Sequence, residues 1–159
     1  PLYPEMTVDS YLLFVARLKG MPRSRLRAAC NQALEKTNLV DVRHRILGHL
    51  SKGYRQRVGL AQAIVHEPEV LILDEPTVGL DPGQIIEIRE LIRSLAGDHT
   101  VILSTHILPE VAETCEKIVI INEGRLTRVA TMAEIQGEGS LEQAFLEAIR
   151  LDHAERPVT

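Results

Sequence analysis

Apolar residues in the first 66 positions recur every three or four residues, which is the spacing of helices that bury one face. The first helix is predicted to start after the capping residue Thr7 and to stop at Gly20. The second runs from Pro22 towards Thr37, and the third opens at Ser51. The apolar faces of the first two helices are expected to comprise Tyr11, Phe14, Val15, Leu18, Leu26, Ala29, Ala33 and Leu34.

Beyond position 66 the pattern changes to strands that alternate with helices. The runs Val70–Leu73 and Val101–Ser104 are short and continuously apolar, as in strands buried on both faces. Asp81 and Pro82 form a cap and first-turn pair for a helix between the two strands. A chain that alternates in this way is typical of an α/β fold with a parallel sheet.

The remaining third is predicted to hold a short helix from about Pro109, then a hairpin and two further helices. Residues 122–124 (Asn-Glu-Gly) are a turn signal between strands 117–121 and 125–130. Capping-box spacing then occurs twice, so one helix is expected after Thr131 and another after Ser140. The last helix carries an apolar stripe that is expected to dock on the body of the protein.

Composition narrows the classes of protein to consider. With 159 residues, 45% of them apolar, the chain is long enough for a folded domain with a core. The longest stretch without a charged residue, His99–Pro109, is too short for a membrane-spanning helix. Cys30 and Cys115 lack the spacing of a metal site or a disulfide framework.

The net charge of −4 is unevenly distributed along the chain. Residues 17–57 carry a formal charge of +9, whereas residues 61–159 carry −11. A basic helical half beside an acidic half is consistent with a phosphate-binding or membrane-proximal face. The simpler interpretation, an ordinary solvated helix surface, is favoured.

Two consecutive carboxylates, Asp74 and Glu75, follow the first apolar strand. Ligands of open parallel sheets gather at the carboxyl edge of the strands. On a regular strand the two side chains would face opposite sides, but Pro76 indicates that the strand breaks there. One carboxylate could then hold Mg²⁺ while the other accepts a proton from a water that attacks a phosphate. The alternative is a surface strand end with two solvated acids.

Ser51 and Gly53 lie at the predicted start of the third helix. The free amides of Lys52, Gly53 and Tyr54 can point at an anion there, although a plain helix cap explains the same residues. Taken singly, the other polar candidates are equally ordinary. Asp81 with the preceding Gly79 fits a turn and cap, and a lone histidine after a strand, such as His106, is more often a surface or core residue than a catalyst.

The order of these segments changes that assessment. The runs LSKGYRQ (50–56), LILDEPT (71–77), GLD (79–81) and STH (104–106) closely resemble the ATP-binding-cassette (ABC) ATPases. Their usual names are the signature, Walker B, D-loop and H-loop motifs. The resemblance extends over nearly the whole chain and is strongest to ATPase subunits of bacterial exporters of the drug-export and gliding-motility kind. It implies a P-loop NTPase-like parallel sheet with flanking helices, preceded by a helical subdomain.

The resemblance also implies roles for individual residues, with ATP and Mg²⁺ as cofactors. In the signature, Ser51 and Gly53, together with Lys52 and Tyr54, would bind the γ-phosphate of a nucleotide held by a partner domain. In the later motifs, Asp74 would be the metal ligand and Glu75 the general base. Asp81 would bridge the dimer, and His106 would contact the γ-phosphate and the attacking water.

This sequence departs from the family pattern in two places. The usual signature has Gly-Gly-Gln where this chain has Lys52-Gly53-Tyr54. In addition, the chain has no G-x-x-x-x-G-K-[ST] segment, the Walker A loop that cradles phosphates. The chain is therefore expected to be the rear part of a nucleotide-binding domain that starts upstream, with an incomplete sheet, and to be inactive alone.

Three parts and one main function are expected. The parts are a helical signature subdomain (1–66), an α/β core with Walker B, D-loop and H-loop (67–137), and a C-terminal docking helix with a tail (138–159). The function is ATP hydrolysis that drives an export permease from the cytoplasmic face of the membrane. The partners are a second nucleotide-binding domain and the integral membrane permease, and no nucleic acid is expected. The alternatives are an ABC ATPase of DNA repair or translation, favoured by the +9 segment, and a catalytically dead remnant that pairs with an intact subunit.

Overall fold

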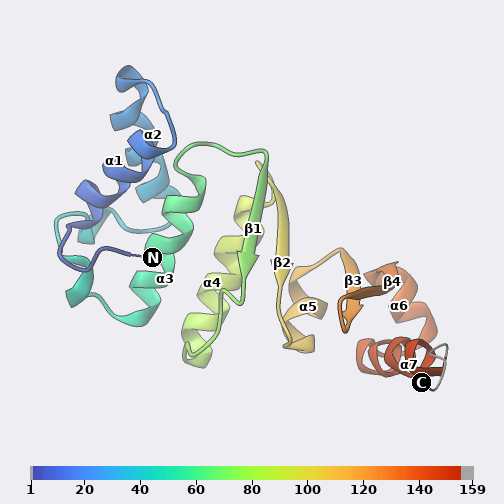
Figure 1. The fold of residues 1–159 in the computed structure, drawn as a ribbon. Coiled ribbons are helices and arrows are strands. Elements are labelled where there is room, and N and C mark those ends of the chain that lie inside the picture. Colours follow the sequence, from blue (N-terminus) through green and yellow to red (C-terminus); the bar gives the residue numbers. More distant parts are fainter. Residues whose placement is uncertain (1, 155–159) are drawn as a thin grey trace. The chain divides into compact units, whose positions relative to one another are not determined.

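A computed structural model describes residues 2–154, with only the backbone described for residues 153 and 154. Figure 1 shows a helical first part of the chain, followed by a part in which strands and helices are mixed. Their bounds are α1 Val8–Leu18, α2 Arg23–Lys36, the 3₁₀ helices η1 Val40–Val42 and η2 Leu47–His49, α3 Lys52–Ile64, β1 Val70–Asp74, α4 Pro82–Leu95, β2 Thr100–Ser104, α5 Leu108–Thr114, β3 Lys117–Asn122, β4 Arg125–Thr131, α6 Met132–Glu138 and α7 Leu141–Ala154.

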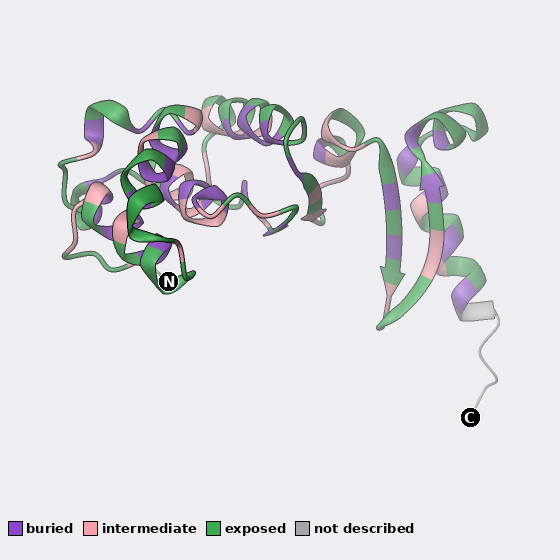
Figure 2. Ribbon diagram, turned by 90° about the horizontal axis from the view of Figure 1, so that it is seen from above, coloured by how far each residue is buried: buried purple, intermediate pink, exposed green. Residues whose placement is uncertain are grey.

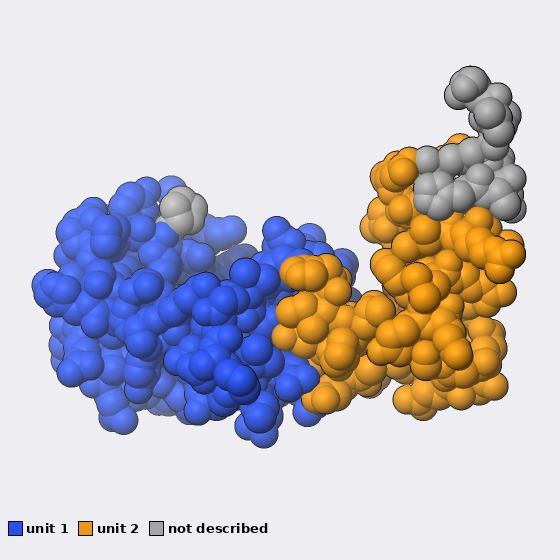
Figure 3. All heavy atoms as spheres, turned by 90° about the horizontal axis from the view of Figure 1, so that it is seen from below, with its two compact units in different colours: residues 1–104 blue, residues 105–159 orange. Residues whose placement is uncertain are grey.

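The chain folds as two compact units, which Figure 3 shows in different colours. Unit 1 comprises Pro1–Ser104 and unit 2 comprises Thr105–Thr159. Each unit has a hydrophobic core of its own. The predicted α/β fold is confirmed, with a parallel strand pair and a helical subdomain before it.

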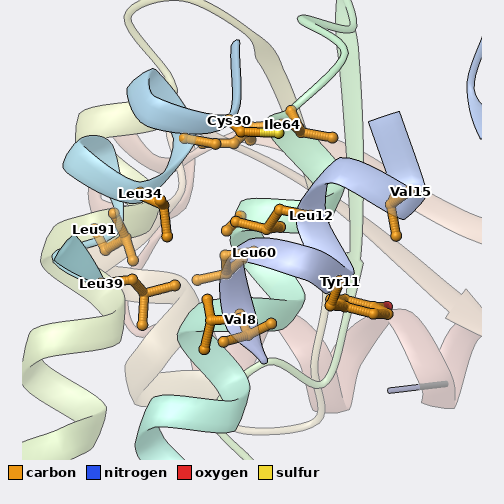
Figure 4. Packing of buried hydrophobic residues seen from close by; sticks show 14 of the residues in the cluster. Val8, Tyr11, Leu12, Val15, Cys30, Leu34, Leu39, Leu60, Ile64 and Leu91 are labelled. Carbon is orange, nitrogen blue, oxygen red and sulfur yellow. The ribbon is translucent and has the colours of Figure 1, made fainter. Parts of the chain in front are cut away.

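The core of unit 1 joins the first three helices to α4. Figure 4 shows Val8 and Leu12 of α1 packed among Leu34 of α2, Leu60 of α3 and Leu91 of α4. Apolar side chains at three- and four-residue spacing drive this packing, because each helix buries one face against the others.

The start of α1 was predicted correctly, but its buried face was predicted only in part. Thr7 caps the helix, and its Oγ1 accepts a hydrogen bond from the Ser10 amide at 3.2 Å. Two residues of the expected face, Phe14 and Leu18, are exposed. The Phe14 ring instead meets Tyr3 edge-on at a centroid separation of 5.6 Å. The buried face of α1 is therefore rotated about the helix axis from the predicted one. It consists of Val8, Leu12 and Ala16, at four-residue spacing, together with Tyr11 and Val15.

Strands β1 and β2 run parallel, and α4 provides the crossover between them. Val70 pairs with Thr100 and Asp74 with Ser104, so both strands end at the same edge. The prediction that these strands are buried on both faces was wrong. Leu71 is 3% exposed but the neighbouring Ile72 is 71% exposed. A similar alternation occurs in β3, where it is visible as purple and green bands in Figure 2. Only one face of the β1–β2 pair packs on the core of unit 1, so alternate side chains remain in solvent.

Unit 2 is built on the predicted hairpin. Strands β3 and β4 pair antiparallel across a turn in which Glu123 and Gly124 adopt positive φ angles of 46° and 80°. Both predicted capping boxes form: Thr131 and Glu134 cap α6, and Ser140 and Gln143 exchange hydrogen bonds of 3.2 Å before α7. The apolar stripe of α7 packs with residues of both strands and of α6.

Among residues 2–154, no helix is both long and apolar enough to cross a membrane. Cys30 is buried in the core of unit 1, Cys115 is half-buried in unit 2, and both are free thiols. Burial raises the pKa of each thiol, which makes both poor nucleophiles. The cysteines therefore pack as small apolar residues.

Asp9 fastens the start of α1 to the rest of the helical block. It accepts hydrogen bonds from Arg27 at 2.8 Å and from Arg43 at 2.5 Å, and its side chain is only 14% exposed. Burial pushes the pKa of Asp9 upward, but the two guanidinium groups outweigh it and hold that pKa below its usual value. The ionised carboxylate is thus favoured in the folded state.

The unequal burial of β1 predicts unequal effects of alanine on its two faces. Leu71→Ala should lower the free energy of unfolding by about 2 to 5 kcal/mol, because it leaves a cavity in the core. Ile72→Ala should cost less than about 1 kcal/mol, because the side chain is largely in water. Urea denaturation followed by circular dichroism measures both changes, and equal losses would contradict the one-sided packing.

Asp9→Asn should lower stability by about 1 kcal/mol at neutral pH, since it removes both charge-assisted contacts. A depressed folded-state pKa stabilises the protein above the unfolded-state pKa of about 3.9, and this contribution is lost as the pH falls towards the folded-state value. The difference between wild type and variant should therefore be full above about pH 5 and shrink below about pH 4. A difference that stays constant between pH 6 and pH 3 in urea titrations would contradict this role of Asp9.

Candidate functional site

The candidate site lies where β1 and β2 end and where α4 begins, at one end of unit 1 (Figure 1). Parallel strands expose their last carbonyl groups at this edge, and helix starts expose free amides. The start of α3 joins the same region through two close contacts, described below. Strand ends and helix starts together provide carboxylates and backbone donors in one place.

The signature segment, defined here as Ser51–Tyr54, forms the start of α3. Ser51 is the N-cap, and its Oγ accepts the Tyr54 amide at 3.4 Å. Ser51, Lys52 and Tyr54 are exposed, whereas Gly53 is buried. The first turn therefore presents a hydroxyl and helix amides to solvent, and the positive end of the helix dipole favours an anion there.

Two contacts tie the signature segment to the residues before and within α4. A Cβ atom on Gly79 would lie 2.0 Å from Nζ of Lys52, so this ammonium group sits directly over the turn at Gly79. A Cβ atom on Gly53 would lie 2.9 Å from Cδ of Gln84. Gln84 was not identified from the sequence; its position three residues after the Asp81 cap was the only available signal.

The two carboxylates at the end of β1 lie where the strand breaks, as expected. Ladder pairing stops at Asp74, and the Glu75 amide makes one further hydrogen bond of 2.9 Å to the Ser104 carbonyl. Glu75 then adopts a φ of 46°, which side chains other than glycine rarely do, and its carbonyl accepts the Val78 amide at 3.3 Å. The Ser104 hydroxyl donates to Oδ1 of Asp74, so the β2 end orients the first carboxylate.

Asp81 caps α4, and its Oδ1 accepts the Gln84 amide at 3.0 Å. The preceding turn runs through Thr77, which is buried, and Gly79, whose φ of 71° suits glycine. The turn after Glu75 is therefore anchored at both ends: by the strand at Glu75 and by the helix cap at Asp81.

A pocket of about 300 Å³ opens between α3 and α4. Residues of the signature segment and Gln84 line one end of the pocket. The complete lining consists of Ser51, Gly53, Tyr54, Gln84, Asn38, Arg57, Glu87 and Ile88. Ser51, Gln84, Arg57 and Glu87 provide hydrogen-bonding or charged groups among these residues.

His106 is the one candidate residue that belongs to unit 2. It is exposed and lies in the segment between β2 and α5. The other candidates, Ser51 to Tyr54, Asp74, Glu75 and Asp81, all belong to unit 1.

Ion pairs account for much of the basic segment 17–57. Arg25 pairs with Glu67 at 2.6 Å, Lys36 with Asp98 at 2.5 Å and Arg57 with Glu87 at 2.7 Å, in addition to the two arginines on Asp9. The pairing with Lys36 lowers the pKa of the exposed Asp98 carboxyl. These cations form ion pairs on the helix surface. This supports the interpretation of the +9 segment as an ordinary solvated helix surface.

In the part of the chain that the structure describes, no three His, Cys, Asp or Glu side chains gather as a metal site. Asp74 nevertheless fits Mg²⁺ as a single protein ligand, because this ion is usually held by one or two carboxylates together with substrate phosphates and water. An exposed carboxylate, oriented by Ser104, is suited to that arrangement.

This chain is similar to known proteins over most of its length. The ABC transporter family profile matches residues 1–78. The uncharacterized ABC transporter ATP-binding protein YxlF of Bacillus subtilis is 34% identical over 140 residues, which are 86% of this chain and 48% of that protein. The Nod factor export ATP-binding protein I of Burkholderia orbicola is 39% identical over 125 residues, which are 78% of this chain and 41% of that protein. The chain thus spans about half the length of the curated relatives it matches.

A solved structure has the same fold. The structure of cbiO1 from Clostridium perfringens, described as part of the ABC transporter complex cbiONQ, superposes with a TM-score of 0.76 at 30% identity. The match covers 94% of this chain and 61% of that one. With its motifs, fold and relatives in agreement, the chain belongs to the ATP-binding-cassette (ABC) transporter ATP-binding family.

Proposed function

We propose that this chain supplies the signature, Walker B and D-loop machinery of an ATP-hydrolysing subunit that drives a membrane permease. The observation that carries the proposal is the gathering of three elements at one end of unit 1. These are the capped start of α3, the carboxylates that end β1, and the capped start of α4. ATP hydrolysis needs a phosphate contact, a metal ligand and a proton acceptor. The end of β1 offers the last two, and the start of α3 offers a phosphate contact to the nucleotide of a partner domain.

Export is the direction of transport that we propose. The relative named for Nod factor export, 39% identical to this chain, supports this direction. The subunit would act on the cytoplasmic face of the membrane by binding an integral permease, and would dimerise with a second nucleotide-binding domain. The ion-paired helix surface of residues 17–57 gives no particular support to a nucleic-acid partner.

At the end of β1, the two carboxylates would divide the chemistry. Mg²⁺, when bound with ATP, neutralises charge that develops on the transferred phosphate. Asp74 would be its ligand from this chain, held in orientation by the Ser104 hydroxyl. Glu75 would accept the proton of the attacking water at its carboxylate, and the hydrogen bonds on both sides of its backbone fix the position of that group.

The signature segment would act on the nucleotide of the partner domain. Ser51 and the first-turn amides of α3 would donate to its γ-phosphate, and Lys52 would add a positive charge beside them. Asp81 would bridge the two domains. His106, from unit 2, would hold the γ-phosphate and the attacking water.

Glu75→Gln tests the general base. In the complete gene product that contains this sequence, the variant should keep nucleotide binding and lose about 10² to 10⁴-fold in ATP turnover, because an amide cannot accept the proton. Glu69→Gln, at the opposite and exposed end of β1, is the matched control and should keep full turnover. Steady-state ATPase assays and nucleotide-binding titrations measure the two quantities. Unchanged turnover in Glu75→Gln would remove Glu75 from the mechanism.

Ser51→Arg tests the contact with the partner's nucleotide. On a Glu75→Gln background, the variant should block ATP-driven dimerisation without weakening ATP binding to the subunit's own site, because a bulky side chain covers the helix start. Ser140→Arg is the matched control, since it removes the N-cap of α7 at a similar cost of about 1 kcal/mol. Size-exclusion chromatography with ATP reports the dimer. The proposal fails if Ser51→Arg dimerises as well as the control.

A further inference from the structure

Gly53 lies against the side-chain amide of Gln84. A Cβ atom at position 53 would come within 2.9 Å of Cδ, 3.1 Å of Oε1 and 3.2 Å of Nε2 of Gln84. Gly53 is in the first turn of α3, where the helical backbone suits any residue. Because position 53 has no side chain, the carboxamide of Gln84 occupies the space that a Cβ atom would take.

Gln84 is held at the same time by the start of α4. Its amide donates to Oδ1 of the Asp81 cap at 3.0 Å. One residue therefore contacts both the first turn of the signature helix and the cap of the helix that follows the D-loop. Its backbone is fixed by one helix start, and its side chain rests on the other.

A second contact one turn further keeps the two helices in register. Arg57 of α3 pairs with Glu87 of α4 at 2.7 Å, and its guanidinium also donates to the Thr37 carbonyl at 3.4 Å. The Arg57 side chain is 13% exposed and the Glu87 side chain 60% exposed, so water reaches this pair from the Glu87 side. Position 53 contacts position 84, and position 57, one turn later on α3, contacts position 87, one turn later on α4. The two helices therefore run in the same direction, and their capped starts lie at the same end of unit 1.

We propose that Gln84 is a positioning residue of the signature segment. Its carboxamide, seated on Gly53, fixes the first turn of α3 against the start of α4, so that Ser51 and Asp81 meet the partner's nucleotide as one rigid unit. Gly53 is then glycine because of Gln84 and not only because a phosphate must approach. The role at the nucleotide rests on the proposed function, whereas the Gly53–Gln84 contact does not.

A double-substitution experiment in the complete gene product tests this role. Gly53→Ala should leave the protein folded, because the obstacle is the end of a flexible side chain that can move aside. Displacing the carboxamide should still lower kcat for ATP by about tenfold with little change in KM, since misplacing a positioned group by about 1 Å can cost up to about 10²-fold. Gln84→Ala should give a similar loss. The double variant should lose no more than the worse single variant, because both changes break the same contact.

The control variant lies on the same helix as Gln84. Ile86→Ala, on the exposed side of α4, should keep wild-type kinetics. If Gly53 served only the approach of the phosphate, Gln84→Ala would keep wild-type kcat, and the losses in the double variant would be those of Gly53→Ala alone. Independent losses would instead multiply. Either result would overturn the inference.

A measurement without nucleotide separates this inference from the proposed function. In ¹H–¹⁵N spectra of the gene product, Gly53→Ala should shift the Gln84 side-chain NH₂ resonances, whereas Ile86→Ala should shift them less. Unchanged Gln84 resonances would overturn the inference, even if Ser51→Arg still blocks dimerisation. If Ser51→Arg does not block dimerisation, the proposed function fails, while the spectra still report whether the contact exists.

Discussion

The contact between the first turn of α3 and the first turn of α4 is the constraint on which the candidate site depends. Gly53 has no side chain, and the carboxamide of Gln84 occupies the space beside it. The Arg57–Glu87 ion pair adds a second contact between the two helices one turn further along. Because both helices start at the same end, two sets of unpaired amides and two positive dipole ends face the same region. A carboxylate, Asp81, caps one of them, while the other, capped by the neutral Ser51, can receive an anion.

The sheet contributes to this end of unit 1 by where it stops. Strand pairing ends at Asp74 and Ser104, and Glu75 reverses the chain through a left-handed conformation. A residue held in such a conformation needs support from its surroundings, and the hydrogen bonds at Ser104 and Val78 provide it. These backbone hydrogen bonds thus stabilise the unfavourable conformation of Glu75 and also hold the proposed general base in position.

Much of the fold follows from local sequence signals, because caps and apolar spacing act over a few residues. The Thr7, Ser51, Asp81 and Thr131 caps were each located correctly, as was the hairpin turn. Burial was harder to predict, since it depends on what covers a surface. A continuous apolar run such as β1 indicates burial on both faces, yet only one face is covered here, and Phe14 looks like a core residue but packs on Tyr3 instead. Gln84 could not be identified, because its role arises from a contact across 31 positions of sequence.

The core of unit 1 gives the site its rigidity. The buried Leu50 directly precedes the Ser51 cap, the buried Leu73 precedes Asp74, and the buried Ile88 follows Gln84 by one turn. Each polar group is therefore attached to a neighbour that is fixed by close packing, and side chains fixed in this way hold few alternative positions. Donors and charges that are already in place need no rearrangement when charge develops on a bound phosphate, which is the condition under which they stabilise a transition state most. The same packing that makes the helical block stable thus also sets how well these residues can serve the proposed ATP hydrolysis.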